Sequence, residues 1–443
     1  MTDGAGLSSR IAVFGLGRSG LGVAQAAVAR GESVIVVDEA NELAKPELLS
    51  DARKLGVTVE TNWSGEFSDI QPIDTVVTNP AVPMDHPKLA AAVKQGIDVI
   101  SEVEYAFRIA KAPILAITGT NGKSTTTVMT WLILQAAGVK ARLCGNLYGS
   151  GYPEETLTMA ALEAKSDEVL VAEISSFQLE WVARFRPIAA AITTISEDHL
   201  NRYAGSMERY TAVKRQIWAA QTPSDTAVTR FGSPEEKFAR ALKGPLVKTF
   251  GPGGDVDFSR VEKWLPHNQL NAASAALLAL RVLPDFDVND MTMQGLRNFQ
   301  GLAHRLEDLG SKDGIQVINN SMCTNPDAVI ASAASNKARI HLIVGGVNKG
   351  LDFKPLANYL SSGKDHVYLF GQDRHEIGSV LAQTIPEPPQ FLTMEEAFIE
   401  ATNRANAGEI IMLAPGCAST DQFRDFIDRG NVFKAIIKKW LGS

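Results

Sequence analysis

Short apolar runs alternate with stretches of helical periodicity from the start of the chain. Strand-like runs occupy residues 11–16 and 33–38, and a helical pattern of small residues lies between them at 19–29. A third short strand at 75–77 precedes a helical pattern near 86–95. Because strands that alternate with helices are joined by crossovers, this pattern predicts a parallel sheet.

The same alternation continues to the end of the chain. Further predicted strands occupy residues 113–117, 141–146, 167–175, 188–196, 316–320, 340–345, 366–370 and 409–413. Further predicted helices occupy residues 124–137, 206–221, 270–282, 327–335, 394–405 and 421–440. The predicted fold class is therefore α/β, with three consecutive domains at residues 1–111, 112–303 and 304–443, and the first and third are expected to be Rossmann-like.

A glycine-containing turn joins the strand at 113–117 to the helix at 124–137. It reads Gly119-Thr120-Asn121-Gly122-Lys123-Ser124-Thr125. A helix N-terminus after such a turn offers unpaired N–H groups to a phosphate, Lys123 adds a positive charge, and a hydroxyl can bind Mg²⁺. The glycines are closer together than in the usual P-loop, and a chance Lys-Ser pair in a simple turn is the alternative. We favour phosphate binding, which predicts a P-loop ATPase-type central domain.

The first turn of the chain carries a dinucleotide-type fingerprint. It reads Gly15-Leu16-Gly17-Arg18-Ser19-Gly20, and Asp38 stands at the end of the next strand, where a ribose or base contact is expected. These glycines establish only a tight turn that can hold a diphosphate. An NAD-dependent dehydrogenase and an enzyme of a UDP-linked substrate both remain open.

Polar residues stand at the ends of two central strands. The strand at 167–175 ends in Glu173-Ile174-Ser175, and an acidic residue near its carboxyl end, in the P-loop domain, is placed to hold Mg²⁺. His199 follows the strand at 188–196 and is either a second metal ligand or a capping residue. The helical periodicity places Lys214 on a helix and gives it no further role.

Composition narrows the functional classes. The 443 residues carry a formal net charge of −7, which argues against a nucleic-acid-binding surface. No apolar run approaches the roughly 18 residues of a membrane span, and residues 1–10 lack the apolar core of a signal peptide. We expect a cytoplasmic monomer without nucleic-acid or membrane partners. The three cysteines have no metal-ligand spacing and are expected to be core residues.

Several separate motifs together resemble the Mur ligases of peptidoglycan synthesis. They lie at residues 119–125, 173–180, 198–203, 267–272 and 304–307. The stretch Cys417-Ala418-Ser419-Thr420-Asp421-Gln422-Phe423, with Phe426 and Arg429-Gly430-Asn431, is similar to the MurD branch, which adds D-glutamate to UDP-N-acetylmuramoyl-L-alanine. The resemblance covers essentially the whole chain. It implies an ATP-dependent acid–amino-acid ligase of cell wall biogenesis that forms an acyl phosphate.

The resemblance also implies roles for matching positions in the first two domains. In the Mur ligase family the first domain binds the UDP part of the substrate. The resemblance implies the same role here for Gly15, Gly17, Arg18, Ser19, Asp38 and Asn79. Residues 119–125 hold the ATP phosphates, and Asn268 and Asn271 contact the nucleotide. The ligands implied for two Mg²⁺ ions are Ser124, Thr125, Glu173, His199 and Lys214, the last as a carbamylated lysine. Asn146 is implied to position the substrate.

In the third domain, the resemblance assigns Arg305 to an ATP phosphate and Lys349, Ser419 and Phe426 to the incoming glutamate. Together with Lys123, Glu173, His199 and Lys214, Arg305 completes the implied catalytic set. A mobile third domain, hinged near residues 300–304, is expected because a site shared by several domains generally closes around its substrate.

The sequence departs from the family pattern mainly in the third domain. Asn320 stands where the family has an acid, Met322 where it has a base, and Val347 where a turn usually carries an acid. Near Asn146, Leu147-Tyr148-Gly149 replaces the usual Ile-Gly pair. We expect D-glutamate to remain the acceptor because Lys349, Ser419 and Phe426 are present. A ligase for L-glutamate or another amino acid, a dehydrogenase and a catalytically silent binding protein are the alternatives.

Overall fold

The computed structural model describes residues 9–42, 45–70, 72–261, 264, 266–297, 299–334 and 336–442. Most of the polar segment 1–10 and the last residue of the helix predicted at 327–335 therefore lie outside the described residues. The chain forms two compact units. The first unit comprises Met1–Tyr148 and Pro153–Phe299, and the second unit comprises Gly149–Tyr152 and Gln300–Ser443.

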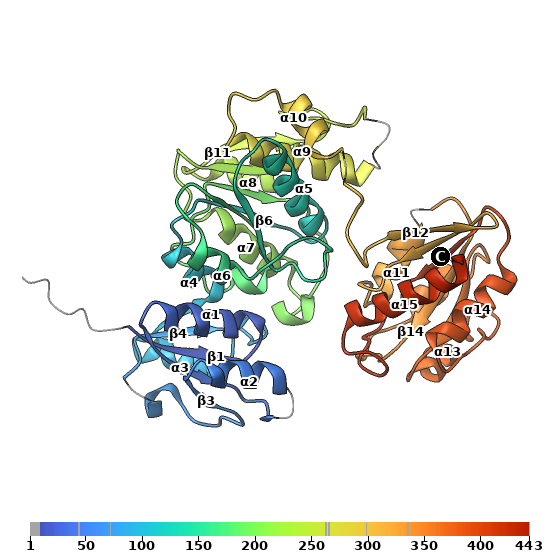
Figure 1. Cartoon of the computed structure of the whole chain (residues 1–443), viewed down its shortest axis with the longest axis horizontal. Helices are drawn as coiled ribbons and strands as arrows, with labels where there is room; N and C mark the ends of the chain where they lie inside the picture. The colour runs from blue at the N-terminus through green and yellow to red at the C-terminus, as the bar shows by residue number, and fades with distance from the viewer. Residues whose placement is uncertain are drawn as a thin grey trace, which may run out of the picture. The chain divides into compact units, whose positions relative to one another are not determined.

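The first sheet of the first unit is parallel and has the order β3-β2-β1-β4-β5 (Figure 1). Its strands are β1 (Arg10–Phe14), β2 (Ser33–Val37), β3 (Thr58–Glu60), β4 (Thr75–Thr78) and β5 (Asp98–Ser101). Its helices are α1 (Arg18–Ala29), α2 (Pro46–Lys54), α3 (Pro87–Lys94) and α4 (Glu102–Ile109). This order places the turns after β1 and β4 side by side at the carboxyl edge, where ligands bind in such sheets.

The second sheet of the first unit is also parallel, with the order β11-β10-β9-β6-β8-β7. Its strands are β6 (Ile114–Thr118), β7 (Ala141–Gly145), β8 (Val169–Glu173), β9 (Ala189–Ile192), β10 (Thr226–Arg230) and β11 (Leu246–Phe250). Its α-helices are α5 (Lys123–Ala136), α6 (Leu157–Glu163), α7 (Met207–Arg215), α8 (Pro234–Ala241), α9 (Pro266–Leu280) and α10 (Val288–Gly295).

Two sequence predictions in this sheet are corrected by the structure. The strand predicted at 188–196 ends at Ile192, because Thr193 and Thr194 turn toward the P-loop, where both hydroxyls donate to the carbonyl oxygen of Asn121 at 2.6 and 3.1 Å. The helix predicted at 206–221 is α7 followed by a separate 3-10 turn, Gln216–Trp218.

The two sheets of the first unit share one apolar core. Val23 of α1, Val103 of α4 and Leu157 of α6 belong to a buried cluster that also contains residues of both sheets. The carboxylate of Glu104 on α4 is fully buried, and its Oε2 accepts three successive backbone N–H groups, those of residues 183–185, at 2.8–3.0 Å. Because that loop leads into β9, Glu104 fastens the first sheet to the second.

The described residues of the second unit form one mixed sheet in the order β12-β13-β16-β14-β15, in which β12 pairs antiparallel with β13 and the other strands pair in parallel. Its strands are β12 (Glu307–Lys312), β13 (Ile315–Asn319), β14 (Ile340–Gly345), β15 (His366–Phe370) and β16 (Ile410–Leu413). Its helices are α11 (Pro326–Ala334), α12 (Lys354–Leu360), α13 (Arg374–Leu381), α14 (Met394–Arg404) and α15 (Phe426–Leu441). Separate apolar clusters cover the two faces.

Helix α15 begins five residues later than the predicted helix at 421–440. The Asp425 side chain caps it by accepting the N–H of Asp428 at 2.8 Å, and the preceding residues form turns. The predicted α/β fold class is confirmed by the three sheets. Within the described part of the chain, no helix is long and apolar enough to cross a membrane.

Candidate active site

The turn between β6 and α5 has the geometry of a phosphate cradle. Gly119 has a φ of 146° and Gly122, the N-cap of α5, has a φ of 84°, so both lie in the region that favours glycine. A Cβ on Gly122 would approach Asn271 Oδ1 to 2.5 Å. The helix therefore starts at Lys123, and its first N–H groups and dipole can hold an anion.

Glu173 lies beside this cradle with half of its carboxylate unused. The sheet register pairs Glu173 with Ile117 on β6 and with Gly145 on β7, which brings the ends of three strands together. Asn146 Nδ2 donates to Glu173 Oε1 at 3.0 Å. Glu173 Oε2 is buried and has no hydrogen-bond partner among the described residues. A buried anionic oxygen without a donor calls for a cation, so this position suits a divalent metal ion.

Lys214 on α7 contacts the P-loop directly. Its side chain is buried, and Nζ donates to the carbonyl oxygen of Gly119 at 2.8 Å and lies 4.7 Å from the centre of the Tyr210 ring. Burial, assisted by the charge of Lys123, lowers the pKa of Lys214 to about 7 although Asp198 and Glu173 oppose the shift. A large fraction of this amine is therefore neutral and nucleophilic near neutral pH.

His199 follows β9 in a left-handed conformation with a φ of 51°. Its half-exposed ring lies 4.9 Å from that of Phe177, and Nε2 is 3.5 Å from Asp198 Oδ2. Burial lowers the pKa of His199, and Lys123 and Lys214 add to this effect against Asp198. The imidazole is thus held neutral, as a metal ligand must be.

The described residues contain no group of three His, Cys, Asp or Glu side chains that could alone hold a metal ion. A cation at Glu173 would therefore complete its shell with other oxygens, such as hydroxyls and ligand phosphates. The predicted residues Ser124 and Thr125 are buried in the first turn of α5, on the same cradle. The residues present fit a hard cation that binds together with a phosphate.

The N-terminal half of α9 lies against the cradle as well, through Asn271. Asn271 Oδ1 accepts from the Thr126 hydroxyl of α5 at 3.4 Å, and Asn271 Nδ2 lies 3.5 Å from Asn268 Oδ1. The structure thus brings together Lys123, Glu173, His199, Lys214 and the two asparagines of α9.

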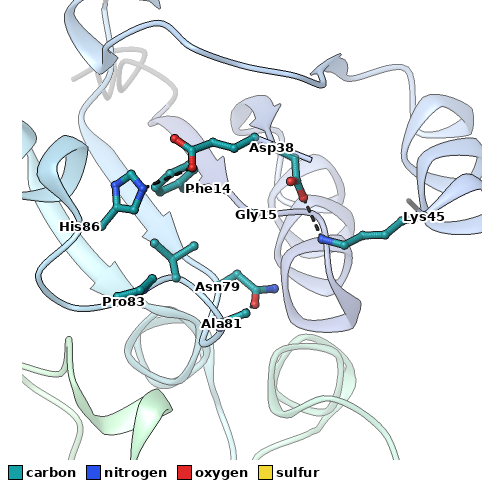
Figure 2. Close-up of a pocket in the computed structure, with 10 residues that line it drawn as sticks. Phe14, Gly15, Asp38, Lys45, Asn79, Ala81, Pro83 and His86 are labelled. Atoms are coloured by element: carbon teal, nitrogen blue, oxygen red, sulfur yellow. Dashed lines mark hydrogen bonds and ion pairs between the residues drawn. The ribbon is translucent and has the colours of Figure 1, made fainter. Parts of the chain in front are cut away.

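A cavity of about 210 Å³ lies at the carboxyl edge of the first sheet. Figure 2 shows the Asp38–Lys45 pair on one side of this cavity and His86 on the other, with the loop of Asn79 and Ala81 between them. Lys45 Nζ is 3.0 Å from Asp38 Oδ2, and His86 Nε2 is 3.3 Å from Glu39 Oε2. The cavity contains both hydrogen-bonding and charged groups, as a nucleotide site requires.

Asp38 is held as a carboxylate at this cavity. Burial alone would raise its pKa, but the N–H groups of Ala40 and Leu16 and the Lys45 ammonium together lower it below the usual 3.8. Lys45 and His86 were missed by the sequence analysis. Lys45 stands in a polar stretch without a motif, and the only signal for His86 was its place before the proline that opens α3.

The predicted diphosphate turn faces Asn79. Asn79 Nδ2 lies so close to Gly17 that a Cβ on Gly17 would come within 2.6 Å of it. Arg18 stacks on the Tyr148 ring at 4.3 Å. Gly15 and Gly17 therefore face Asn79, and Arg18 and Ser19 follow them as the first residues of α1.

In the second unit, the structure brings Ser419 and Phe426 close to one loop. The guanidinium of buried Arg429 donates to the carbonyl oxygens of Cys417 and Ser321 at 3.1 and 2.9 Å, and the Ser321 hydroxyl donates to the carbonyl oxygen of Phe426 at 2.7 Å. The backbones of Val347 and Ala418 exchange two hydrogen bonds, which places the exposed Lys349 on a neighbouring loop. Arg305 is half-buried between His304 and Leu306, which both have positive φ.

The surroundings of Asn320 explain the amide at this position. Its Nδ2 donates to Ser332 Oγ at 2.8 Å, and the Ser332 hydroxyl itself donates to the carbonyl oxygen of Ala328. A carboxylate at 320 would have no proton for Ser332. Met322 is 39% exposed, so this neutral side chain replaces a base near the surface and not in the core.

Three family models match successive parts of the chain. They are described as "Mur ligase MurD-like, N-terminal domain" for residues 9–101, "Mur ligase middle domain" for 117–274, and "Mur ligase, glutamate ligase domain" for 304–417.

Relatives match over nearly their whole length. The "UDP-N-acetylmuramoylalanine--D-glutamate ligase" of Caldanaerobacter subterraneus is 35% identical over 97% of this chain and 98% of the relative. The protein of the same name from Shigella boydii is 33% identical over 97% and 98%. Among solved structures, the UDP-N-acetylmuramate-alanine ligase MurC of Thermotoga maritima aligns with a TM-score of 0.58 at 20% identity, covering 98% of this chain and 99% of the other. This last likeness concerns the fold.

Proposed function

This chain belongs to the Mur ligase family, and from that premise we propose that it joins D-glutamate to UDP-N-acetylmuramoyl-L-alanine at the expense of ATP, in peptidoglycan precursor synthesis. The two relatives described above, which carry the name of this activity, support the proposal over the length of the chain.

The chemistry requires activation, because a carboxylate is a poor acyl donor. The L-alanyl carboxylate attacks the γ-phosphorus of ATP, ADP leaves, and an acyl phosphate forms. The amine of glutamate then attacks the acyl carbon, and phosphate leaves from the tetrahedral intermediate. Both partners of the first step are anions. Lys123 at the cradle and Arg305 are assigned to offset their repulsion.

Mg²⁺, when bound, neutralises charge on the transferring phosphoryl group. Glu173 would hold it through the unpaired Oε2, together with His199 and the hydroxyls of Ser124 and Thr125, and the family implies two such ions. We further propose that Lys214 is carbamylated. Its amine, with a pKa of about 7, would add CO₂, lose a proton and become an anionic ligand.

The remaining residues are assigned to the two other substrates. The cavity beside Asp38 and the Gly15–Gly17 turn would take the uridine and diphosphate, and Asn146 would orient the sugar peptide. Lys349 and Ser419 would bind the carboxylates of glutamate, and Phe426 would pack against its chain.

The single observation that carries the proposal is the buried, unpaired Oε2 of Glu173 beside the N-terminus of α5. The test is phosphate release from ATP with Mg²⁺ and UDP-N-acetylmuramoyl-L-alanine, comparing D-glutamate, L-glutamate and a panel of other amino acids. Release that depends on D-glutamate is expected. Phosphate release that occurs only with another amino acid would contradict D-glutamate as the acceptor. Equal phosphate release in the absence of the sugar nucleotide would contradict the proposed ligase activity.

A further inference from the structure

Arg202 makes an unusual set of contacts outside the residues assigned above. It lies in the 3-10 turn Leu200–Tyr203, directly after His199, and its side chain is only 12% exposed. Its guanidinium reaches two other segments of the first unit, one at the cavity of the first sheet and one after β8.

Toward the first sheet, Arg202 binds three successive carbonyl oxygens. They belong to Pro80, Ala81 and Val82, at 3.0, 3.2 and 2.7 Å. These residues form the loop after β4, and Ala81 and Val82 line the cavity shown in Figure 2. A planar fork of N–H donors can hold such a row of carbonyls, which a single ammonium group does less well.

These hydrogen bonds fix the orientation of residues 79–82 toward the diphosphate turn. With the carbonyl oxygens held by Arg202, the Ala81 N–H donates to Asn79 Oδ1 at 3.0 Å, and the Val82 N–H donates to the Asn79 carbonyl oxygen at 2.9 Å. The Asn79 side chain is thereby oriented with Nδ2 beside Gly17.

On its other side, Arg202 is anchored to the loop after β8. Its Nε and Nη2 donate to the two oxygens of Glu180 at 3.0 and 2.6 Å, and the carboxylate of Glu180 is only 1% exposed. The guanidinium also stacks on Phe177 at 4.5 Å, and the Phe177 ring contacts His199. Arg202 therefore joins three loops, those that follow β4, β8 and β9.

We propose that the Arg202–Glu180 ion pair is a positioning clamp that holds the diphosphate-binding loop of the first sheet at a fixed distance from the reaction centre on the second sheet. This inference rests on the proposed function, because a sugar nucleotide must reach from the cavity to the phosphoryl group of ATP. The first sheet then positions the nucleotide end of this substrate, and the second sheet positions its reacting end. Small errors in the distance between them misalign the reacting atoms and lower the rate steeply.

The test uses the full-length protein with R202M and a matched control, R186M. Arg186 also pairs with a carboxylate that is 1% exposed, at 2.7 Å, but its partner Asp225 precedes β10, and its guanidinium also donates to the hydroxyls of Thr222 and Ser224. Steady-state kinetics with each substrate and thermal unfolding are measured for both variants. R202K, which keeps the charge but not the fork, serves as the conservative variant.

We expect R202M to lower kcat/KM for the sugar nucleotide by about tenfold or more, the scale for losing charge-assisted hydrogen bonds. Its KM for ATP should stay within about twofold, and R202K should lie between R202M and the wild type. R186M should lose thermal stability without changing kcat/KM for the sugar nucleotide. Equal kinetic losses in R202M and R186M, or a rise in the KM for ATP as large as that for the sugar nucleotide, would overturn the clamp.

A second readout does not depend on which reaction the enzyme catalyses. In hydrogen exchange of the free protein, the amides of residues 81 and 82 should exchange at least about threefold faster in R202M than in the wild type and in R186M. Unchanged exchange there would overturn the clamp even in a fully active enzyme. A wild type that is inactive with D-glutamate but shows the faster exchange in R202M would instead contradict only the proposed function.

Discussion

At the scale of single residues, burial gives the candidate site its chemistry. The same burial that leaves Glu173 with an unused carboxylate oxygen keeps Lys214 from holding its proton firmly. In water, neither side chain would have this property, since a carboxylate would be solvated and a lysine fully charged. The reactivity therefore comes from the packing around β6 and α7 as much as from the residue types.

Replacing Lys214 with alanine should lower kcat by about 100-fold or more, since an anionic carbamate would no longer be available to the metal site. Formate or acetate in the buffer should restore part of the activity by supplying an oxygen anion. Phosphate release measures both effects, and K237A, on the exposed side of α8, is the control. Full activity of K214A would contradict the carbamate.

Glu102 should make the protein sensitive to pH. Burial raises the pKa of this fully buried carboxyl above its usual 4.5, although the side chains of Gln178 and Thr158 donate to it. The folded state therefore holds the proton more firmly than the unfolded state, so the stabilising contribution of Glu102 is fully present below pH 4.5 and is lost as the pH rises through its folded pKa.

The variant E102Q should consequently be more stable than the wild type at pH 8, by about 1 kcal/mol, and should lose this advantage at pH 4.5. Thermal unfolding of both proteins at the two pH values measures it. The same difference at both values would show that Glu102 is not the titrating group.

At the scale of elements, loops after strands are held by single buried side chains. Arg429 on α15 binds the loop after β13 and the loop after β16 through three hydrogen bonds, and burial lowers its pKa to about 10, although Cys417, Asp421 and Cys323 oppose the shift. Ser419 and Phe426 lie on segments that these bonds hold.

The variant R429M should destabilise the protein by about 3 kcal/mol, because it leaves buried carbonyl oxygens without donors. The matched control is R424M, since Arg424 is 85% exposed and lies 3.7 Å from Asp428, so its loss should cost less than about 1 kcal/mol. Urea unfolding compares the two variants. Equal losses of unfolding free energy in the two variants would mean that the buried hydrogen bonds of Arg429 contribute no more than an exposed ion pair.

The sequence predicted these elements better than it predicted their contacts. Local periodicity was sufficient for β6, the turn at Gly119 and α5, because strand, turn and helix are consecutive. It placed the start of α15 five residues early, since the apolar pattern continues into the turn that Asp425 ends. It gave no sign that Arg202 binds residues about 120 positions away, because long-range pairing leaves no local pattern.

At the scale of the whole molecule, the predicted roles are divided between two compact units. The cavity of the first sheet and the phosphate cradle belong to the first unit, whereas Arg305, Lys349, Ser419 and Phe426 belong to the second unit. Apart from Arg305, which is assigned to an ATP phosphate, the residues of the two units are assigned to different substrates, so substitutions in one unit should leave the binding of the other unit's substrate unchanged.

The variant K349A should raise the KM for glutamate by about tenfold or more, as expected for loss of a charged contact to a carboxylate, and should leave UDP and ATP binding unchanged. Phosphate release measures the KM, and isothermal titration measures the nucleotides. K354A, at the start of α12, is the control. An unchanged KM for glutamate would remove Lys349 from the acceptor site.

The core shared by the two sheets of the first unit has a consequence for engineering and evolution. A segment ending near residue 111 would carry the apolar faces of α1 and α4 into water, and Glu104 would lose the loop that it binds. The first sheet should therefore not fold by itself, and recombination could not transfer it alone to another enzyme. The heritable module is the pair of sheets, which should melt in a single cooperative transition.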